Sequence, residues 1–212
     1  MYYNIHTHKA SNTTGVVEII SISPQDTINP QHLISIGIPP WEINDEMAEN
    51  ISWFQNLITK KGIVAIGEIG LDKRLDIPFE KQLNLLSKQI AIAKKNQKPL
   101  IFHCVGGFNE LIQLKREKHI LNACIIHGFR GKEELVKELV RHGFYLSIGE
   151  KSLLHRDAIT TIPLSHLFIE TDMSFCKIED IYSTVALIKS VSVNELKKSI
   201  EQNFIQCFGN VF

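Results

Sequence analysis

The chain has 212 residues, and 44% of them are hydrophobic, which is enough to bury a sizeable core. The chain has 23 basic residues (Lys and Arg) and 23 acidic residues (Asp and Glu), so its formal net charge is zero. A zero net charge excludes a global electrostatic field that attracts nucleic acid. The first residues lack the basic and apolar regions of a signal peptide, and no apolar run approaches the roughly 18 residues of a membrane helix. We therefore expect a cytoplasmic protein that does not enter a membrane.

Eight short runs rich in Ile, Val and Phe recur along the chain, as in strands that are buried on both faces of a parallel sheet. In chain order, the predicted strands cover Tyr2–His6, Val16–Ser21, Leu33–Gly37, Val64–Glu68, Leu100–His103, Ala123–His127, Phe144–Ile148 and Leu167–Glu170.

Helical patterns separate the later strands. In chain order, apolar spacing predicts helices over about Asp45–Lys60, Phe79–Ala93, Leu135–Val140, Ile178–Lys189 and Val193–Cys207. Pro78 suits the first turn of the second helix, and Gly143 suits a cap just after the third.

Strands that alternate with helices form parallel βαβ units, and eight such strands predict a closed (β/α)8 barrel, or TIM barrel. Only about ten residues separate the strands of each of the first two pairs, whereas a parallel crossover needs a dozen or more. We therefore expect an α/β fold whose first two crossover helices are reduced or missing. The chain contains no internal repeat and no linker, so the sequence predicts one domain over residues 1–212.

The four cysteines are widely spaced and form no Cys-x-x-Cys pair, which excludes a disulfide framework and a zinc knuckle. Cys104 and Cys124 lie in apolar strand-like runs, where a small buried thiol is expected. A reducing, cytoplasmic compartment fits this pattern.

Metal-ligand residue types stand where the apolar strands stop. His6 ends the first predicted strand and His8 follows two residues later, so both imidazoles project from the same side of an extended chain. Four further strands stop at the same kinds of residue, namely Glu68, His103, His127 and Asp172. All these ends share one rim of a barrel, the rim where barrel active sites are built. The sequence therefore predicts a metal centre of six residues.

Four imidazoles and two carboxylates exceed what one tetrahedral ion takes. They suit two divalent ions, which would lie about 3.5–4 Å apart, stabilise the attacking and leaving oxygens and lower the pKa of a shared water. By ligand type, four imidazoles favour zinc, manganese or iron over magnesium.

The chain is similar to a known family over several stretches. These are Asn4-Ile5-His6-Thr7-His8, Gly67-Glu68-Ile69-Gly70-Leu71-Asp72, Lys98-Pro99-Leu100-Ile101-Phe102-His103, His127-Gly128-Phe129-Arg130-Gly131 and Glu170-Thr171-Asp172. Together they resemble the TatD family of metal-dependent deoxyribonucleases, within the amidohydrolase-like barrel superfamily. Their order and rough spacing agree from residue 62 onward, whereas the segment from about 9 to 61 is shorter than the family norm, as in a shortened member.

The resemblance implies a metal-dependent hydrolase of ester bonds, a TatD-like DNase, and it implies a role for each ligand. The first ion would be held by His6, His8, Glu68 and Asp172, and the second by Glu68, His103 and His127. Glu68 would bridge the ions, and Asp172 would take a proton from the attacking water. The resemblance also allows magnesium as the ion.

The chain departs from the family pattern at positions that face the substrate. Asn4 stands where the family has Asp, Lys9-Ala10 where it has an apolar residue and Asp, Val105 where it has Arg or Lys, and Ser174 where it has Pro. These departures leave all six ligands in place and bear on the choice of substrate.

Cations follow the same strand ends and are expected to bind an anionic substrate, Arg as a fork and Lys as a point charge. Lys73, Arg74 and Arg130 are the predicted substrate-binding residues, and Lys9, Lys151 and Lys177 lie on the same rim.

Three functions remain open from the sequence. The first is hydrolysis of a phosphodiester in nucleic acid by a metal-activated water. The second is hydrolysis of a small ester, amide or phosphoester, which Val105 and the trimmed early loops favour. The third is a metal-binding barrel without turnover. The intact set of six ligands argues against this third function. We expect a monomer. Glu170 is interpreted as support for a ligand, whereas Asp72 and Asn203 match family positions without an assigned role.

Overall fold

A computed structural model describes residues 1–44 and 50–210 of the chain. The chain divides into two compact units. Unit 1 comprises Met1–Ile20 and Ile125–Phe212, and unit 2 comprises Ser21–Cys124. The prediction of a single domain stays a prediction.

The eight predicted strands are present, and their hydrogen-bonded order along the sheet equals their order along the chain. They are β1 (Tyr2–Thr7), β2 (Val16–Ile22), β3 (Leu33–Ile36), β4 (Ile63–Asp72), β5 (Leu100–Val105), β6 (Cys124–Ile126), β7 (Phe144–Ile148) and β8 (Leu167–Ile169). Within unit 1, β1 packs against β8, and Thr7 forms a parallel bridge with Asp172. This strand order, with the first strand beside the last, is that of the predicted (β/α)8 class.

The first two connections contain no helix in their described residues, 8–15 and 23–32. The prediction of missing early crossover helices is therefore confirmed. Both segments are shorter than a helical crossover requires.

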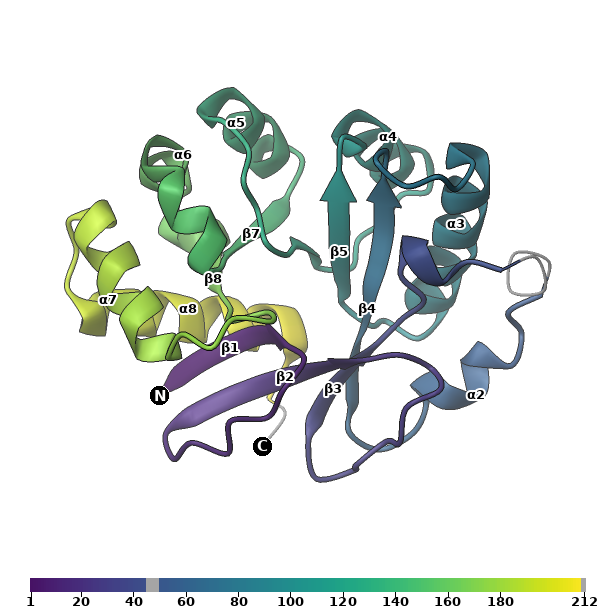
Figure 1. Cartoon of the computed structure of the whole chain (residues 1–212), viewed down its shortest axis with the longest axis horizontal. Coiled ribbons are helices and arrows are strands. Elements are labelled where there is room, and N and C mark those ends of the chain that lie inside the picture. The colour runs from purple at the N-terminus through teal and green to yellow at the C-terminus, as the bar shows by residue number, and fades with distance from the viewer. Residues whose placement is uncertain (45–49, 211–212) are drawn as a thin grey trace. The chain divides into compact units, whose positions relative to one another are not determined.

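Helices follow the later strands (Figure 1). They are α2 (Phe54–Ile58), α3 (Phe79–Lys95), α4 (Phe108–Glu117), α5 (Glu133–Arg141), α6 (Arg156–Thr161), α7 (Ile178–Lys189) and α8 (Val193–Phe208), with 3-10 turns η1 (Pro40–Glu42), η2 (Glu150–Leu154) and η3 (Leu164–His166). The helices α4 and α6 were not predicted. Each of these helices buries only two apolar residues, which are too few to reveal a helical period in the sequence.

The helix predicted over Asp45–Lys60 is wrong in its extent. Residues 45–49 lie outside the described residues, and only α2 is helical in the remainder. The side chain of Asn50 accepts the backbone N–H of Ser52 at 2.9 Å, which is a local turn that competes with the helical ladder. The helix therefore begins only at Phe54.

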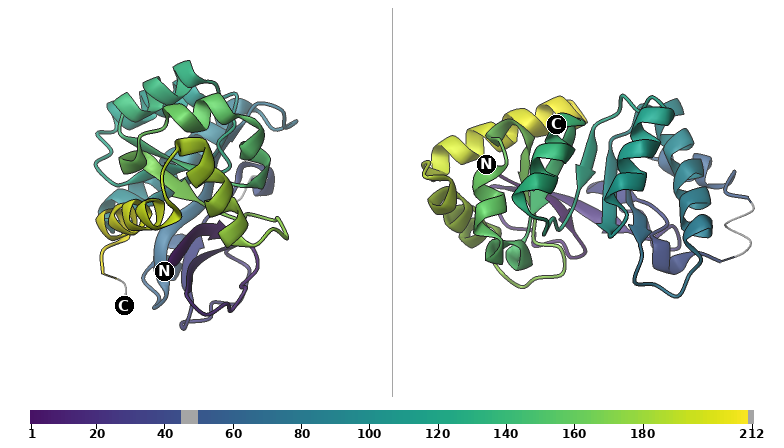
Figure 2. Two further views of the ribbon diagram at one scale, coloured as in Figure 1. Left: turned by 90° about the vertical axis from the view of Figure 1, so that its left-hand side faces the viewer. Right: turned by 90° about the horizontal axis from the view of Figure 1, so that it is seen from above.

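In unit 1, α8 and α7 cover β1, and α8 also packs on β8 and α7 (Figure 2). The rings of Tyr3 and Phe204 meet at 4.7 Å between centroids, and both are buried. Asn203, which had no assigned role, donates from Nδ2 to the carbonyls of Leu164 and Leu167 at 2.8 and 2.9 Å. It therefore fastens α8 to the start of β8.

Replacing Tyr182 by Phe is expected to destabilise unit 1. The buried Tyr182 hydroxyl donates to the carbonyl oxygen of Tyr3 and accepts its N–H, both at 3.0 Å. Without the hydroxyl, both backbone groups of Tyr3 lose this partner, which costs about 1–3 kcal/mol. Urea denaturation measures the loss, and Tyr2→Phe, which alters the neighbouring ring at its edge, should stay within about 0.5 kcal/mol of the parent. Equal stabilities for the two variants would refute this.

In unit 2, β4 pairs in parallel with β3 and β5, and α3 packs against β4. Two buried glutamines of α3 bind the backbone at the ends of β3 and β4. Gln82 accepts from the backbone N–H of Asp72 at 2.8 Å and donates to its carbonyl at 3.1 Å. Gln89 does the same for Ile38, at 2.8 and 3.0 Å. The bonds of Gln82 position the backbone at Asp72, beside the candidate site.

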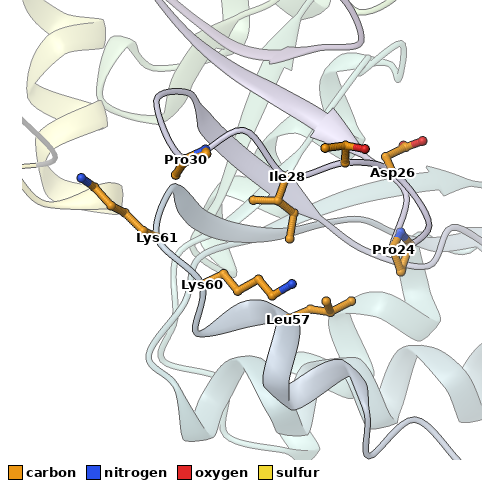
Figure 3. Close-up of a pocket in the computed structure, with 8 residues that line it drawn as sticks. Pro24, Asp26, Ile28, Pro30, Leu57, Lys60 and Lys61 are labelled. Atoms are coloured by element: carbon orange, nitrogen blue, oxygen red, sulfur yellow. The ribbon is translucent and has the colours of Figure 1, made fainter.

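Unit 2 also contains a cavity of about 490 Å³ between the β2–β3 connection and the end of α2 (Figure 3). Its lining comprises Pro24, Asp26, Thr27, Ile28, Pro30, Leu57, Lys60 and Lys61. None of the predicted site residues lines it. Among the described residues, each helix is too short or too polar to cross a lipid bilayer.

Candidate metal centre

Three of the predicted ligands come together in unit 1. His6 lies in β1, His127 directly follows β6, and Asp172 follows β8. One ligand atom from each lies within 4.8 Å of the others, so the group is able to hold a metal ion. His6 is fully buried, and the side chain of Asp172 is one third exposed. The group is thus anchored in the interior and open to solvent at the carboxylate.

His8 faces the same carboxylate as His6. The Nε2 atoms of His6 and His8 lie 3.7 and 3.6 Å from Oδ1 of Asp172. These separations are too long for hydrogen bonds. Two ligands that share a tetrahedral ion at about 2.1 Å stand about 3.4 Å apart, so the spacing fits donors that converge on a cation. The two imidazoles therefore face one carboxylate oxygen.

The backbone holds these two segments together. Asp172 donates its N–H to the carbonyl of His6 at 3.0 Å, and its own carbonyl accepts the N–H of His8 at 3.3 Å. Asn4, a departure from the family pattern, joins the same segments. Its side chain accepts the N–H of Thr171 at 3.0 Å and donates to the Thr171 hydroxyl at 2.8 Å. Asn4 therefore has a structural contact that fixes the ligand-bearing segments in register.

Glu170 supports His127. The Glu170 carboxylate is fully buried, accepts the N–H of Gly128 at 2.7 Å, and places Oε1 3.4 Å from Nδ1 of His127. A carboxylate behind a ligating imidazole orients the ring and raises its basicity. This geometry agrees with the interpretation of Glu170 as support for a ligand.

Unit 2 brings the other two predicted ligands together. Nδ1 of His103 lies 3.0 Å from Oε1 of Glu68, and both side chains are largely buried. The predicted strand ends were wrong here, because β4 continues past Glu68 to Asp72 and β5 continues past His103 to Val105. Both ligands therefore project from within the strands.

Asp72, which had no assigned role from the sequence, belongs to this group. Its Oδ2 lies 3.1 Å from Nε2 of His103, so the imidazole stands between two carboxylates. Asp72 also accepts from Nε and NH2 of Arg74 at 3.0 and 2.7 Å. This fork holds the pKa of the Asp72 carboxyl well below its usual range. Even spacing from Glu68 along one strand was the available signal.

The predicted substrate-binding cations differ in their surroundings. Arg74 is engaged by Asp72, and Nζ of Lys73 lies 2.6 Å from Oε1 of Glu110 in α4. Arg130 is exposed in the segment between β6 and α5. Two of the three cations thus already face a carboxylate of the chain.

The cysteine beside this group does not suit nucleophilic chemistry. Burial raises the pKa of the Cys104 thiol to about 12, so the thiolate is scarce near neutral pH. Cys104 and Cys124 are buried free thiols, as predicted.

Comparisons with known proteins agree on one family. The sequence profile described as TatD related DNase matches residues 6–209. YabD of Bacillus subtilis, described as an uncharacterized metal-dependent hydrolase, is 32% identical over 148 residues, which cover 66% of this chain and 58% of YabD. YjjV of Escherichia coli, with the same description, is 28% identical over 146 residues, 65% of this chain and 56% of YjjV. The matches thus span less than three fifths of these relatives.

The fold is shared with solved structures. The crystal structure of YjjV, a TatD homolog from Escherichia coli K12, has a TM-score of 0.82 at 20% identity, and the match covers 99% of this chain and 98% of that one. Because the profile match extends over nearly the whole chain, the protein belongs to the TatD related DNase family.

Proposed function

We propose that this chain is a divalent-metal-dependent hydrolase that cleaves phosphodiester bonds in nucleic acid. The observation that carries the proposal is the group of His6, His127 and Asp172, together with His8 on the same carboxylate. Neutral imidazoles and carboxylates are the donors that zinc and manganese take in hydrolytic sites. Membership of the TatD related DNase family supports the same class of reaction.

The proposal includes two divalent ions, with zinc, manganese or magnesium as candidates. His6, His8, Glu68 and Asp172 would hold one of them. Glu68, His103 and His127 would hold the other, so Glu68 would serve both. Such ions polarise a phosphoryl oxygen and make a bound water acidic enough to ionise near neutral pH.

The chain's own groups have separate tasks in this proposal. The Asp172 carboxylate would accept a proton from the attacking water, because it is the partly exposed member of the group. Glu170 and Asp72 keep the rings of His127 and His103 in place. Arg130, Lys73 and Arg74 are proposed to bind phosphate, the last two by exchanging their present carboxylate partners.

A nuclease assay tests the proposal. The purified chain is stripped with a chelator, its metal content is checked by elemental analysis, and zinc, manganese or magnesium is added back. End-labelled single-stranded and duplex DNA and RNA are the substrates. We expect nucleotide release that depends on the added ion and stops when chelator returns. If no ion restores cleavage of either nucleic acid, the proposal fails.

A smaller substrate is the second candidate. Asp72 and Glu110 already occupy Arg74 and Lys73, which leaves fewer cations for a long phosphate backbone. Val105, at the end of β5, supplies no charge. Turnover of small phosphoesters, esters or amides by the metal-loaded chain, without nuclease activity, would favour this candidate. A monomeric state and a cytoplasmic location stay predictions.

Replacing Asp72 by Asn is expected to weaken metal binding. The change removes the charge that accepts from Nε2 of His103 and offers that ring an amide instead. Loss of such a partner behind a ligating imidazole costs about 10–100-fold in metal affinity. Competition with a chromophoric chelator measures the affinity. Asp76→Asn is the matched control, because Asp76 is exposed four residues further on. A metal affinity equal to that of the control would contradict the role of Asp72.

A further inference from the structure

An exposed aromatic ring and a lysine lie side by side next to the group of His6, His127 and Asp172. Phe175 is 89% exposed and follows Asp172 by three residues. Nζ of Lys9 lies 4.5 Å from the centre of the Phe175 ring, and Lys9 directly follows His8. A ring that is almost fully in water contributes little to the core, so its face is available to a ligand.

The backbone on both sides of this pair is held in place. The Thr7 hydroxyl donates to the carbonyl of Lys9 at 3.1 Å and accepts its N–H at 3.3 Å. On the other segment, the Ser174 hydroxyl accepts the N–H of Cys176 at 3.0 Å and donates to a carboxylate oxygen of Glu150. The bonds between Asp172 and its partners His6 and His8 join the two segments. Lys9 and Phe175 are therefore presented on a fixed backbone within unit 1.

We propose that Lys9 and Phe175 form a nucleotide platform, on which a base of single-stranded nucleic acid stacks on Phe175 while Lys9 contacts the adjoining phosphate. This inference rests on the proposed hydrolase and names where one nucleotide of its substrate is held. Aromatic side chains beside cations bind unpaired bases in this way, because every base offers a π-face and every linkage a charge.

The position of the pair favours this ligand over others. The platform adjoins two proposed ligands in sequence, His8 on one segment and Asp172 on the other, so a nucleotide on it would place a neighbouring phosphodiester near the reacting group. Lys9 supplies the cation, and Ser174 holds the segment that carries the ring.

Binding without turnover tests the platform. The full chain is kept in chelator, so that cleavage does not occur, and fluorescence anisotropy measures its affinity for a short single-stranded oligonucleotide. A matched oligomer of the same length, with abasic sugars, carries the same phosphates without bases. Phe175→Ala is expected to weaken binding of the oligonucleotide by about 5–150-fold and to leave the abasic oligomer unchanged. Lys9→Gln should weaken both and lower the salt dependence by about 0.7 in slope.

Two further variants distinguish loss of base stacking from a general effect of removing an exposed apolar side chain. Phe175→Tyr should retain the preference for bases, and Leu154→Ala, which removes an equally exposed apolar side chain of unit 1, should bind as the parent does. The proposal is overturned if Phe175→Ala affects both oligomers alike, or if the parent does not prefer bases. Binding of bases without any cleavage after ions are restored would sink the proposed hydrolase alone. Cleavage with an unchanged KM in Phe175→Ala would sink the platform alone.

Discussion

Replacing Asp172 by Asn is expected to lower kcat for nucleic-acid cleavage by about 10²–10⁴-fold, the range that a positioned general base contributes. The amide keeps the size of the side chain but cannot take a proton from water. The backbone bonds of Asp172 to His6 and His8 do not involve the side chain, so the fold should persist. Steady-state rates at saturating metal, with circular dichroism as the check on folding, measure the effect.

The control for this variant is Asp157→Asn, an exposed carboxylate in the first turn of α6. It makes the same change of charge in unit 1 and should leave kcat within about twofold. Metal content is measured in parallel, because Asp172 is also a proposed ligand. An Asp172→Asn enzyme that is fully loaded and turns over as fast as the parent would exclude Asp172 as the base.

The ligand-bearing ends of unit 1 could be predicted from the sequence because each obeys a local rule. His6 and His8 are two residues apart at the end of an apolar run, and alternation along a strand puts them on one side. His127 and Asp172 follow buried runs that are strands of the same sheet. The structure accordingly groups His6 and His127 with Asp172, and it places His8 beside the same Asp172 carboxylate.

The surroundings of the ligands could not be predicted, because they depend on contacts between distant segments. Glu110, the partner of Lys73, lies on α4. This helix was not predicted, because its apolar face is too short to give a periodic signal in the sequence. β4 extends to Asp72 because it stays paired with β5 up to Val105, and Gln82, a polar residue on the buried face of α3, binds the Asp72 backbone as well. A polar side chain that binds the backbone of a strand leaves no periodic signal.

Gly70 shows how closely β4 must approach β5 at the ligand-bearing strands. It stands opposite His103 in the strand register and has a φ of +152°, a conformation that side chains rarely adopt. A Cβ at this position would overlap the carbonyl oxygen of His103. Because that oxygen belongs to the backbone, the clash cannot be relieved by rotating a side chain. Gly70 therefore permits the strand spacing that sets Glu68 and Asp72 on either side of the His103 ring.

Gly70→Ala is consequently expected to destabilise the protein by at least about 3 kcal/mol, from backbone strain and overpacking together. For a chain of this size the melting temperature should fall by about 6–12 °C, which scanning calorimetry measures. Gly15→Ala is the control, since Gly15 also has a positive φ (+84°) but no atom within 4 Å of its added Cβ. That variant has strain alone, about 1 kcal/mol. If both variants melt at the same temperature, the close approach at His103 is not what constrains Gly70, and the strand spacing has another cause.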